Sequence, residues 1–143
     1  MEQGLIQMLV TCLATASAQA DDHTKRRRAR IMVRLEEVLA EHLSRPLEMP
    51  ELCALVAVSD RTLRLCCTQF LGMSPVQYVL LRRLEAVRRA LRDANPHNAN
   101  VAVIAHRFGF AELERFSETY QATFGEAPST TLQRVPRMRL SAP

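Results

Sequence analysis

Apolar residues recur along this chain at intervals of three and four positions, which is the spacing of amphipathic helices. A first helix is predicted over about 31–43, and Arg45-Pro46 disfavours its continuation because the residue before a proline avoids helical backbone. Its inward-facing positions are Ile31, Leu35, Val38, Leu39 and His42. The charge-rich stretch before it, 21–30, is interpreted as a basic linker or the start of this helix.

Two short helices and a long one are predicted next, over about 51–57, 60–70 and 75–93. Pro50 suits a first helical turn, and Ser59 can cap the second helix by accepting a backbone N–H. Gly72 suits a helix end, and Ser74-Pro75 is a cap followed by a first turn. The buried stripe of the long helix is predicted to contain Tyr78, Leu81, Leu84, Val87 and Leu91.

The region after Asn95–Asn100 repeats the pattern of two short helices joined by a turn. Three helices are predicted there, over about 101–107, 112–123 and 128–134. Phe116 and Tyr120 face inward on the second of them, whereas Gly109 and Gly125 mark a turn and a helix end.

The repetition extends to the turn residues. Ala57–Ser59 and Leu71–Pro75 recur as Gly109-Phe110 and Phe124–Pro128, with offsets of 52 and 53 residues. Each copy is too small to bury a core alone and is typical of a helix-turn-helix. Two such units in a small basic protein suggest two helices presented to two successive major grooves of DNA.

Composition agrees with this prediction. The 143 residues suffice for one domain or two very small ones, and four glycines and seven prolines leave little room for many β-turns. We therefore predict an all-α fold, two helix-turn-helix subdomains joined by a long helix and preceded by an N-terminal amphipathic helix. The formal net charge of +4 is compatible with a polyanionic partner but common among soluble proteins.

The four cysteines lack metal-ligand spacing. Cys66 and Cys67 are adjacent, and no pair has C-x-x-C spacing. Because Cys53 and Cys67 fall on apolar faces, they are interpreted as small buried hydrophobic residues in a reducing cytoplasm. No metal or cofactor is predicted.

The N-terminal segment 5–20 is apolar and ends in Ala18-Gln19-Ala20, which resembles a signal-peptidase site. No Lys or Arg precedes it, its apolar residues fall on one helical face, and it is too short to cross a bilayer. We expect a surface helix, with homodimerisation through residues 5–20 as one use, rather than a signal peptide or a membrane anchor.

The outward side chains of the second helix in a helix-turn-helix decide what it binds. In the first copy, the residues predicted to contact DNA are Ser59, Asp60, Arg61, Thr62, Arg64, Leu65 and Thr68. Arg61 and Arg64 lie three positions apart on one face, and arginine can donate two hydrogen bonds to guanine, worth ~1–3 kcal/mol of discrimination. The alternative is a pair of solvated surface arginines.

The second copy is less basic. Its outward positions are Leu113, Glu114, Ser117, Glu118 and Gln121. Arg115, Ser117 and Gln121 are predicted to contact DNA, but carboxylates near phosphates mostly repel them. Seven arginines stand against four acids over 46–92, and three against five over 93–134, so the first unit is expected to dominate DNA affinity.

Five arginines crowd the long helix: Arg82, Arg83, Arg88, Arg89 and Arg92. They either follow phosphates or solvate an ordinary surface, and the sequence leaves both possibilities open.

Catalytic motifs are missing: there is no P-loop, G-x-G-x-x-G, H-E-x-x-H or G-x-S-x-G. The four histidines, His23, His42, His97 and His106, are scattered without ligand spacing. We therefore predict that the chain is not an enzyme.

Taken together, these strings resemble the DNA-binding region of the AraC/XylS family of bacterial transcription regulators. The resemblance covers about residues 31–134 and lies in Val58–Leu63, Leu71–Pro75, Tyr78, Arg82–Leu84, Ala90-Leu91, Ile104-Ala105, Phe108–Phe110, Phe116-Ser117, Tyr120 and Phe124–Pro128. It implies seven helices, promoter recognition through Arg61, Arg64 and their neighbours, and contact with RNA polymerase. It also implies that residues 1–30 correspond to the linker helix that follows a sensing domain.

Two positions depart from the family pattern. Ala57 stands where the turn often has glycine, a change of little cost if its φ is negative. Ala111 stands where the family often has an aromatic or polar residue, and its small side chain removes a possible base or phosphate contact.

The predicted organisation is an N-terminal helix and basic linker (1–30), a first helix-turn-helix with the connecting helix (31–94), a second helix-turn-helix (95–134) and a flexible tail (135–143). The predicted function is sequence-specific binding of double-stranded DNA by a transcription regulator in the bacterial cytoplasm, at the nucleoid. The alternative is a truncated interaction module that dimerises with full-length regulators and antagonises them.

Overall fold

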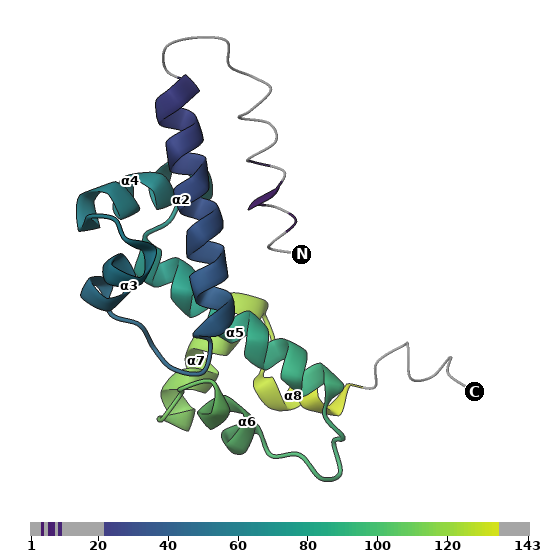
Figure 1. Ribbon diagram of the computed structural model, residues 1–143. Coiled ribbons are helices and arrows are strands. Elements are labelled where there is room, and N and C mark those ends of the chain that lie inside the picture. Colours follow the sequence, from purple (N-terminus) through teal and green to yellow (C-terminus); the bar gives the residue numbers. More distant parts are fainter. Residues whose placement is uncertain (1–3, 5, 8, 10–21, 135–143) are drawn as a thin grey trace. The chain divides into compact units, whose positions relative to one another are not determined.

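The computed structural model describes residues 4, 6, 7, 9 and 22–134 (Figure 1). Within 22–134 the chain forms seven helices and no strand, which confirms the all-α prediction. The helices are α2 (Asp22–Glu41), α3 (Met49–Val56), α4 (Asp60–Leu71), α5 (Pro75–Asp93), α6 (Val101–Arg107), α7 (Leu113–Phe124) and α8 (Pro128–Gln133).

The chain divides into two compact units. The first contains residues 1–42 and 47–79, and the second contains residues 43–46 and 80–143. Helix α5 begins in the first unit and continues in the second. Each unit has its own apolar core and is considered by itself.

The first core is aliphatic and is formed where α2 packs against α3 and α4. Leu35 and Leu39 from α2, Leu52 from α3 and Leu63 from α4 are all fully buried, as their spacing predicted. Full burial of a leucine side chain contributes about 1.5–3 kcal/mol, so these residues dominate the stability of the unit. Burial raises the pKa of Cys67 to about 12, which keeps this thiol neutral inside the core.

Helix α2 begins at Asp22 rather than near residue 31, so of the two interpretations of the basic stretch, the start of the helix holds for residues 22–30 and the linker does not. Lys and Arg are good helix formers, and Asp22 pairs with Arg26 one turn later at 2.8 Å. Ala29 is buried, which secures this part of α2 against the rest of the first unit. High charge density alone did not distinguish a solvated helix from a linker.

The N-terminal apolar segment is described at a few positions only. Ile6 is buried within the first core, and Leu9 packs against it. The other positions of the predicted helix 5–20, apart from Gln7, and all of the tail 135–143 lie outside the described residues. None of the described helices is long and apolar enough to span a membrane.

The second core contains an aromatic ladder. The ring centroids of Phe110 and Phe116 lie 4.9 Å apart, those of Phe116 and Tyr120 lie 5.6 Å apart, and those of Tyr120 and Phe124 lie 4.7 Å apart. Spacings of this size favour tilted and edge-to-face pairs, which are worth about 0.5–1.5 kcal/mol each. Phe116 and Tyr120 are buried, as predicted, together with Leu84, Val87 and Leu91 of α5.

Two buried tyrosines are satisfied by hydrogen bonds within their own units. Tyr78 donates to Oε2 of Glu36 at 2.7 Å, so Glu36 belongs to the first unit's interior. Tyr120 donates to Oγ1 of Thr131 at 2.7 Å, and the Thr131 hydroxyl donates to Glu126. The second chain of hydrogen bonds ties α8 to α7 and closes the second core.

Candidate DNA-binding surface

The turn into α4 is built around a strained alanine. Ala57 ends α3 with φ +66° and ψ +43°, in the left-handed region, and its N–H donates to the Cys53 carbonyl at 2.8 Å. The small cost expected for alanine in place of glycine depended on a negative φ, and the positive φ of Ala57 does not meet that condition. Arg34 of α2 donates from Nε to the Val56 carbonyl at 3.2 Å and so braces the turn.

Helix α4 begins with the predicted serine cap. Ser59 Oγ accepts the Thr62 N–H at 3.2 Å and donates to Thr62 Oγ1 at 2.9 Å. The cap satisfies one of the free N–H groups at the helix start. Gly72 ends the helix in the left-handed region, again as predicted. These two ends fix the length of the helix that presents the predicted contact residues.

The outward face of α4 matches the predicted set. Exposed side chains on this face are Asp60, Arg61, Arg64, Leu65 and Thr68. Leu65 is 47% exposed, which adds an apolar side chain to the face that carries the two arginines.

An ion pair fixes one of the two arginines. Arg64 Nε donates to Asp60 Oδ1 at 2.5 Å, one helical turn away. This bond raises the pKa of Arg64. Because the contact uses Nε, the two Nη groups of Arg64 remain available for a partner.

The second turn is braced in the same way as the first. Arg83 of α5 donates from Nε and Nη2 to the Phe108 carbonyl at 3.1 and 2.9 Å, and its guanidinium lies 4.2 Å from the centre of the Phe110 ring. Gly109 has φ +85°, and a Cβ there would lie 2.8 Å from both Arg83 Nη2 and the Arg45 Cα. Only glycine therefore fits this turn.

The sequence left two interpretations of the arginines on α5, phosphate contact or a solvated surface, and neither holds for two of them. Arg82 and Arg83 are 8% and 6% exposed, so they neither solvate a surface nor follow phosphates. Arg88 is half-buried and lies over the Phe124 ring at 4.6 Å. Arg89 and Arg92 are exposed.

Helix α7 presents a more acidic face. Glu114, Arg115, Glu118 and Gln121 are exposed, Ser117 is half-buried, and Leu113 is 45% exposed. The predicted contact residues Arg115, Ser117 and Gln121 thus share this helix with two carboxylates. The side chain of Glu112, at the start of α7, makes no capping hydrogen bond.

Sequence reasoning missed the two bracing arginines. Arg34 and Arg83 lie on the helices that precede each helix-turn-helix, outside the repeated strings, so the repeat did not reveal them. Both side chains support backbone carbonyls at the turn and hold the following helix in position.

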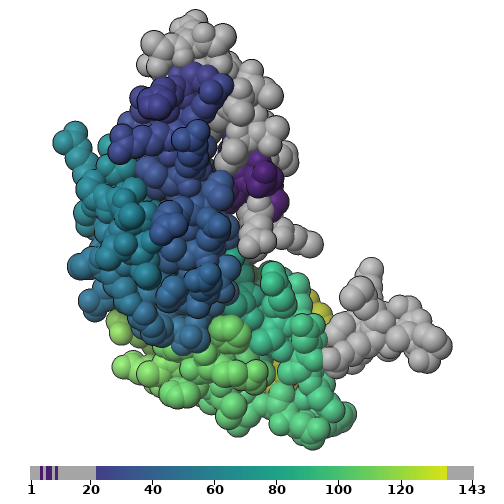
Figure 2. All heavy atoms as spheres, in the orientation of Figure 1, coloured from purple at the N-terminus to yellow at the C-terminus, as the bar shows by residue number. Residues whose placement is uncertain are grey.

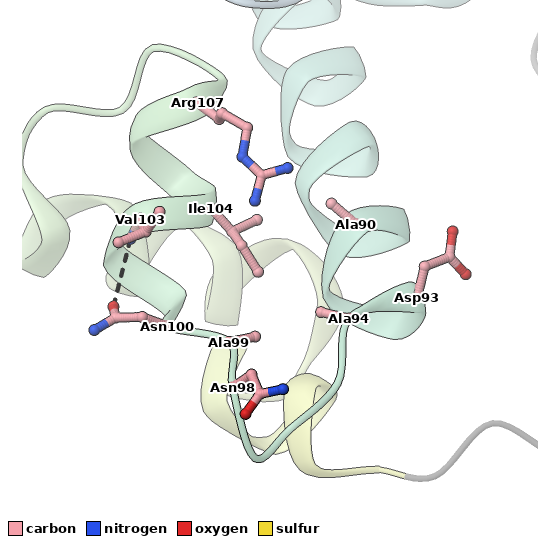
Figure 3. Close-up of a pocket in the computed structure, with 9 residues that line it drawn as sticks. All are labelled: Ala90, Asp93, Ala94, Asn98, Ala99, Asn100, Val103, Ile104 and Arg107. Carbon is pink, nitrogen blue, oxygen red and sulfur yellow. Dashed lines mark hydrogen bonds between the residues drawn. The ribbon is translucent and has the colours of Figure 1, made fainter.

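A hollow of about 410 Å³ lies between the end of α5 and the start of α6 (Figure 3). Small and apolar side chains, Ala90, Ala94 and Ile104, form its floor, and Asn100 accepts the Val103 N–H with its side chain at 3.4 Å. Figure 3 shows the Asp93 carboxylate turned away from Ile104. Asn98 and Arg107 also line the hollow, so polar and apolar side chains share its wall.

A family model described as a helix-turn-helix domain matches residues 52–134. The chain is 36% identical over 101 residues to the XylDLEGF operon transcriptional activator 1 of Pseudomonas putida, a match that covers 71% of this chain and 30% of that protein. It is 33% identical over 99 residues to the transcriptional activator 2 of the same operon, covering 69% of this chain and 63% of that protein.

A solved structure supports the same assignment. A probable AraC family transcriptional regulator from Rhodopseudomonas palustris superposes with a TM-score of 0.64 and 31% identity, over 75% of this chain and 99% of that one. The chain belongs to the AraC/XylS family of DNA-binding transcription regulators. This AraC/XylS chain spans about a third of the first relative's length, and its family membership confirms the prediction that it is not an enzyme.

Proposed function

We propose that the chain binds double-stranded DNA sequence-specifically through α4 as the principal recognition helix, with α7 in the next major groove as the weaker partner. The observation that carries this proposal is the difference in charge between the two helices: α4 exposes Arg61 and Arg64, whereas α7 exposes Glu114 and Glu118. Arginines attract both phosphates and guanine edges, whereas carboxylates repel the backbone.

The face of α4 offers a different contact at each position. Arg61 and Arg64 suit guanine O6 and N7, and Leu65 suits the methyl group of thymine. Thr68 can donate a hydrogen bond to a base or a phosphate. At the helix start, Ser59 and Thr62 bond to each other and Ser59 accepts the Thr62 N–H, so we expect the remaining backbone N–H groups there to meet a phosphate.

Helix α7 offers fewer contacts of this kind. Gln121 suits adenine, Arg115 suits guanine or a phosphate, and Ser117 suits either partner. Glu114 can accept a hydrogen bond from cytosine N4, but at the groove edge its carboxylate repels the phosphate backbone. We therefore assign α7 a smaller share of the affinity.

A comparison of two variants tests this ranking. Arg61→Ala with Arg64→Ala should weaken specific binding by a few kcal/mol in total, because two guanine contacts at ~1–3 kcal/mol each are lost. Glu114→Ala should leave affinity equal or higher. Fluorescence anisotropy with a selected duplex measures both. If Glu114→Ala is the more damaging change, the ranking of α4 over α7 is wrong.

Promoter binding and contact with RNA polymerase extend the same proposal. The relatives from Pseudomonas putida are described as operon transcriptional activators, which supports this role. Binding to chromosomal DNA would place the chain in the bacterial cytoplasm, at the nucleoid. Transcription from a selected promoter, with and without the chain, measures the effect.

The second candidate is an interaction module that pairs with full-length regulators through residues 5–20. The acidic face of α7 favours it, because Glu114 and Glu118 reduce DNA affinity in that unit. Burial of Ile6 in the chain's own core counts against an apolar face free for a second copy. Self-association on sedimentation, with no DNA binding at low salt, would favour this candidate over the first.

A further inference from the structure

We propose that the first turns of α2 form a second DNA-contacting surface, on which Arg27 and Arg30 bind backbone phosphates beside the groove that α4 enters. This inference rests on the proposed function, because it requires α4 to lie on duplex DNA. It gives a role to the basic stretch that the sequence alone left open as a linker or a helix start.

The basic turns are attached to the recognition helix rather than separate from it. Helix α2 packs against α4 within the first unit (Figure 1), and Ala29 and Met32 are 3% and 2% exposed. Arg28 donates from Nη1 to Oε1 of Gln69 on α4 at 3.0 Å. Since Gln69 directly follows Thr68, this bond places the basic turns beside the C-terminal half of the proposed DNA-facing helix.

Several positive charges on these turns have no ion-pair partner among the described residues. Asp22 pairs with Arg26 at 2.8 Å. Lys25, Arg27 and Arg30 are exposed and make no ion pair with any residue that the structure describes. Figure 2 shows atoms of the first turns of α2 at the surface of the molecule. Of the three, Arg27 and Arg30 lie three positions apart on one face of the helix, so these two are available together to an anionic partner.

Several other basic side chains of the first unit are already engaged. Arg34 supports carbonyls at the end of α3 and Arg28 bonds to Gln69, whereas the free Nη groups of Arg64 are assigned to a base. Arg61 is likewise assigned to a base. The α2 turns are therefore the main source of phosphate contacts in this unit. A guanidinium is well suited to them, because its parallel N–H groups match phosphate oxygens.

The spacing also fits a nucleic-acid backbone. Residues 27 and 30 lie about 4.5 Å apart along the helix axis, at ~1.5 Å per residue. One strand of duplex DNA has a phosphate about every 3.4 Å along its axis, so the surface spans about two phosphates. We infer that it lengthens the footprint of the first unit at one flank without contacting bases.

A charge-matched pair of variants tests the inference. Arg27→Gln with Arg30→Gln removes two exposed charges from α2, and Arg89→Gln with Arg92→Gln removes two exposed charges from α5. Affinity for a selected duplex is measured over a salt series, and hydroxyl-radical footprints are recorded. Thermal unfolding confirms that both variants fold, as expected for exposed positions.

The α2 variant should flatten the plot of log K against log salt by about 2 units, at ~0.9 per phosphate contact, and lose protection at one flank. Its sequence preference should not change, and the α5 variant should match the wild type. An unchanged slope and footprint in the α2 variant would overturn this inference alone. Equal losses in both variants would overturn it too, by showing a general charge effect. A wild-type chain that selects no DNA would overturn the proposed function with it.

Discussion

At the scale of single residues, Ala57 is the one described non-glycine residue with a positive φ, and it lies at the turn that leads into α4. The left-handed region costs an L-residue about 1–2 kcal/mol, because Cβ approaches the following carbonyl. Hydrogen bonds from the N–H groups of Ala57 and Val58 to the Cys53 carbonyl, and from Arg34 to Val56, hold the strained turn in place.

Ala57→Gly should therefore raise the free energy of unfolding by about 0.5–1 kcal/mol, the strain relieved less the entropy that glycine adds to the unfolded chain. Urea denaturation measures the change. Ala54→Gly is the matched control, because Ala54 is exposed within α3 and the same substitution there should cost about 1 kcal/mol. A loss of stability at Ala57 would contradict the left-handed backbone.

Asp60 has two opposed effects on DNA binding. Its carboxylate repels phosphates, yet it holds Arg64 by the Nε contact at 2.5 Å. Asp60→Asn should raise affinity for a scrambled duplex and lower the ratio of specific to non-specific affinity by about tenfold, within the ~1–3 kcal/mol that one arginine–guanine pair contributes. Titration of both duplexes measures the ratio. Equal gains on the two duplexes would show that Asp60 does not position Arg64.

At the scale of helices and turns, the two units share a device that the repeat did not contain. In each unit, an arginine on the first helix supports carbonyls at the turn before the recognition helix: Arg34 at Leu55 and Val56, and Arg83 at Phe108. The support fixes the angle between the two short helices. We expect the second brace to matter more for stability, because Arg83 is the more buried of the two.

Arg83→Met should lower the free energy of unfolding by about 2–3 kcal/mol, since two charge-assisted hydrogen bonds and the stacking on Phe110 are lost. Arg89→Met on the exposed part of the same helix should change it by less than about 0.5 kcal/mol. Chemical denaturation measures both variants. Equal effects would mean that the Arg83 contacts contribute little.

The attachment of α8 to α7 should depend on pH. The Thr131 hydroxyl, and then the Arg134 guanidinium, hold the pKa of Glu126 below its usual range. Because the folded pKa is depressed, this stabilisation is present above the unfolded value of about 4.3 and is lost as pH falls through the folded value.

Glu126→Gln should therefore destabilise the fold at neutral pH and show a smaller loss of stability on acidification than the wild type. Urea midpoints measured at about pH 6 and about pH 3 provide the comparison. Glu118→Gln, at an exposed position of α7, should keep the wild-type dependence. If both variants titrate alike, the carboxylate of Glu126 does not stabilise the fold through Thr131.

At the scale of the whole molecule, the sequence predicted helices where local chemistry decides them. Ser59, Gly72 and Gly125 set helix ends through capping and left-handed backbone, and the structure confirms each. The sequence did not predict that Arg83 faces inward, because its partner, the Phe108 carbonyl, lies 25 residues away and leaves no local signal. The early start of α2 was missed because exposed helices and linkers share a polar composition.

The outward face of α4 was predictable for the same physical reason. Once Leu63 and Cys67 are buried, helical periodicity leaves Arg61, Arg64 and Leu65 exposed, as observed. The Asp60–Arg64 contact and the basic surface of α2 depend on side-chain geometry and tertiary packing, so periodicity alone could not reveal them.

The central claim is that this chain selects particular DNA sequences, mainly through α4. Its most direct test is retention of genome fragments by the purified chain across a salt series. The account predicts enrichment of fragments that share a motif, with affinity falling steeply as salt rises, because several phosphates are neutralised. A folded chain that retains no fragment selectively at low salt would contradict it.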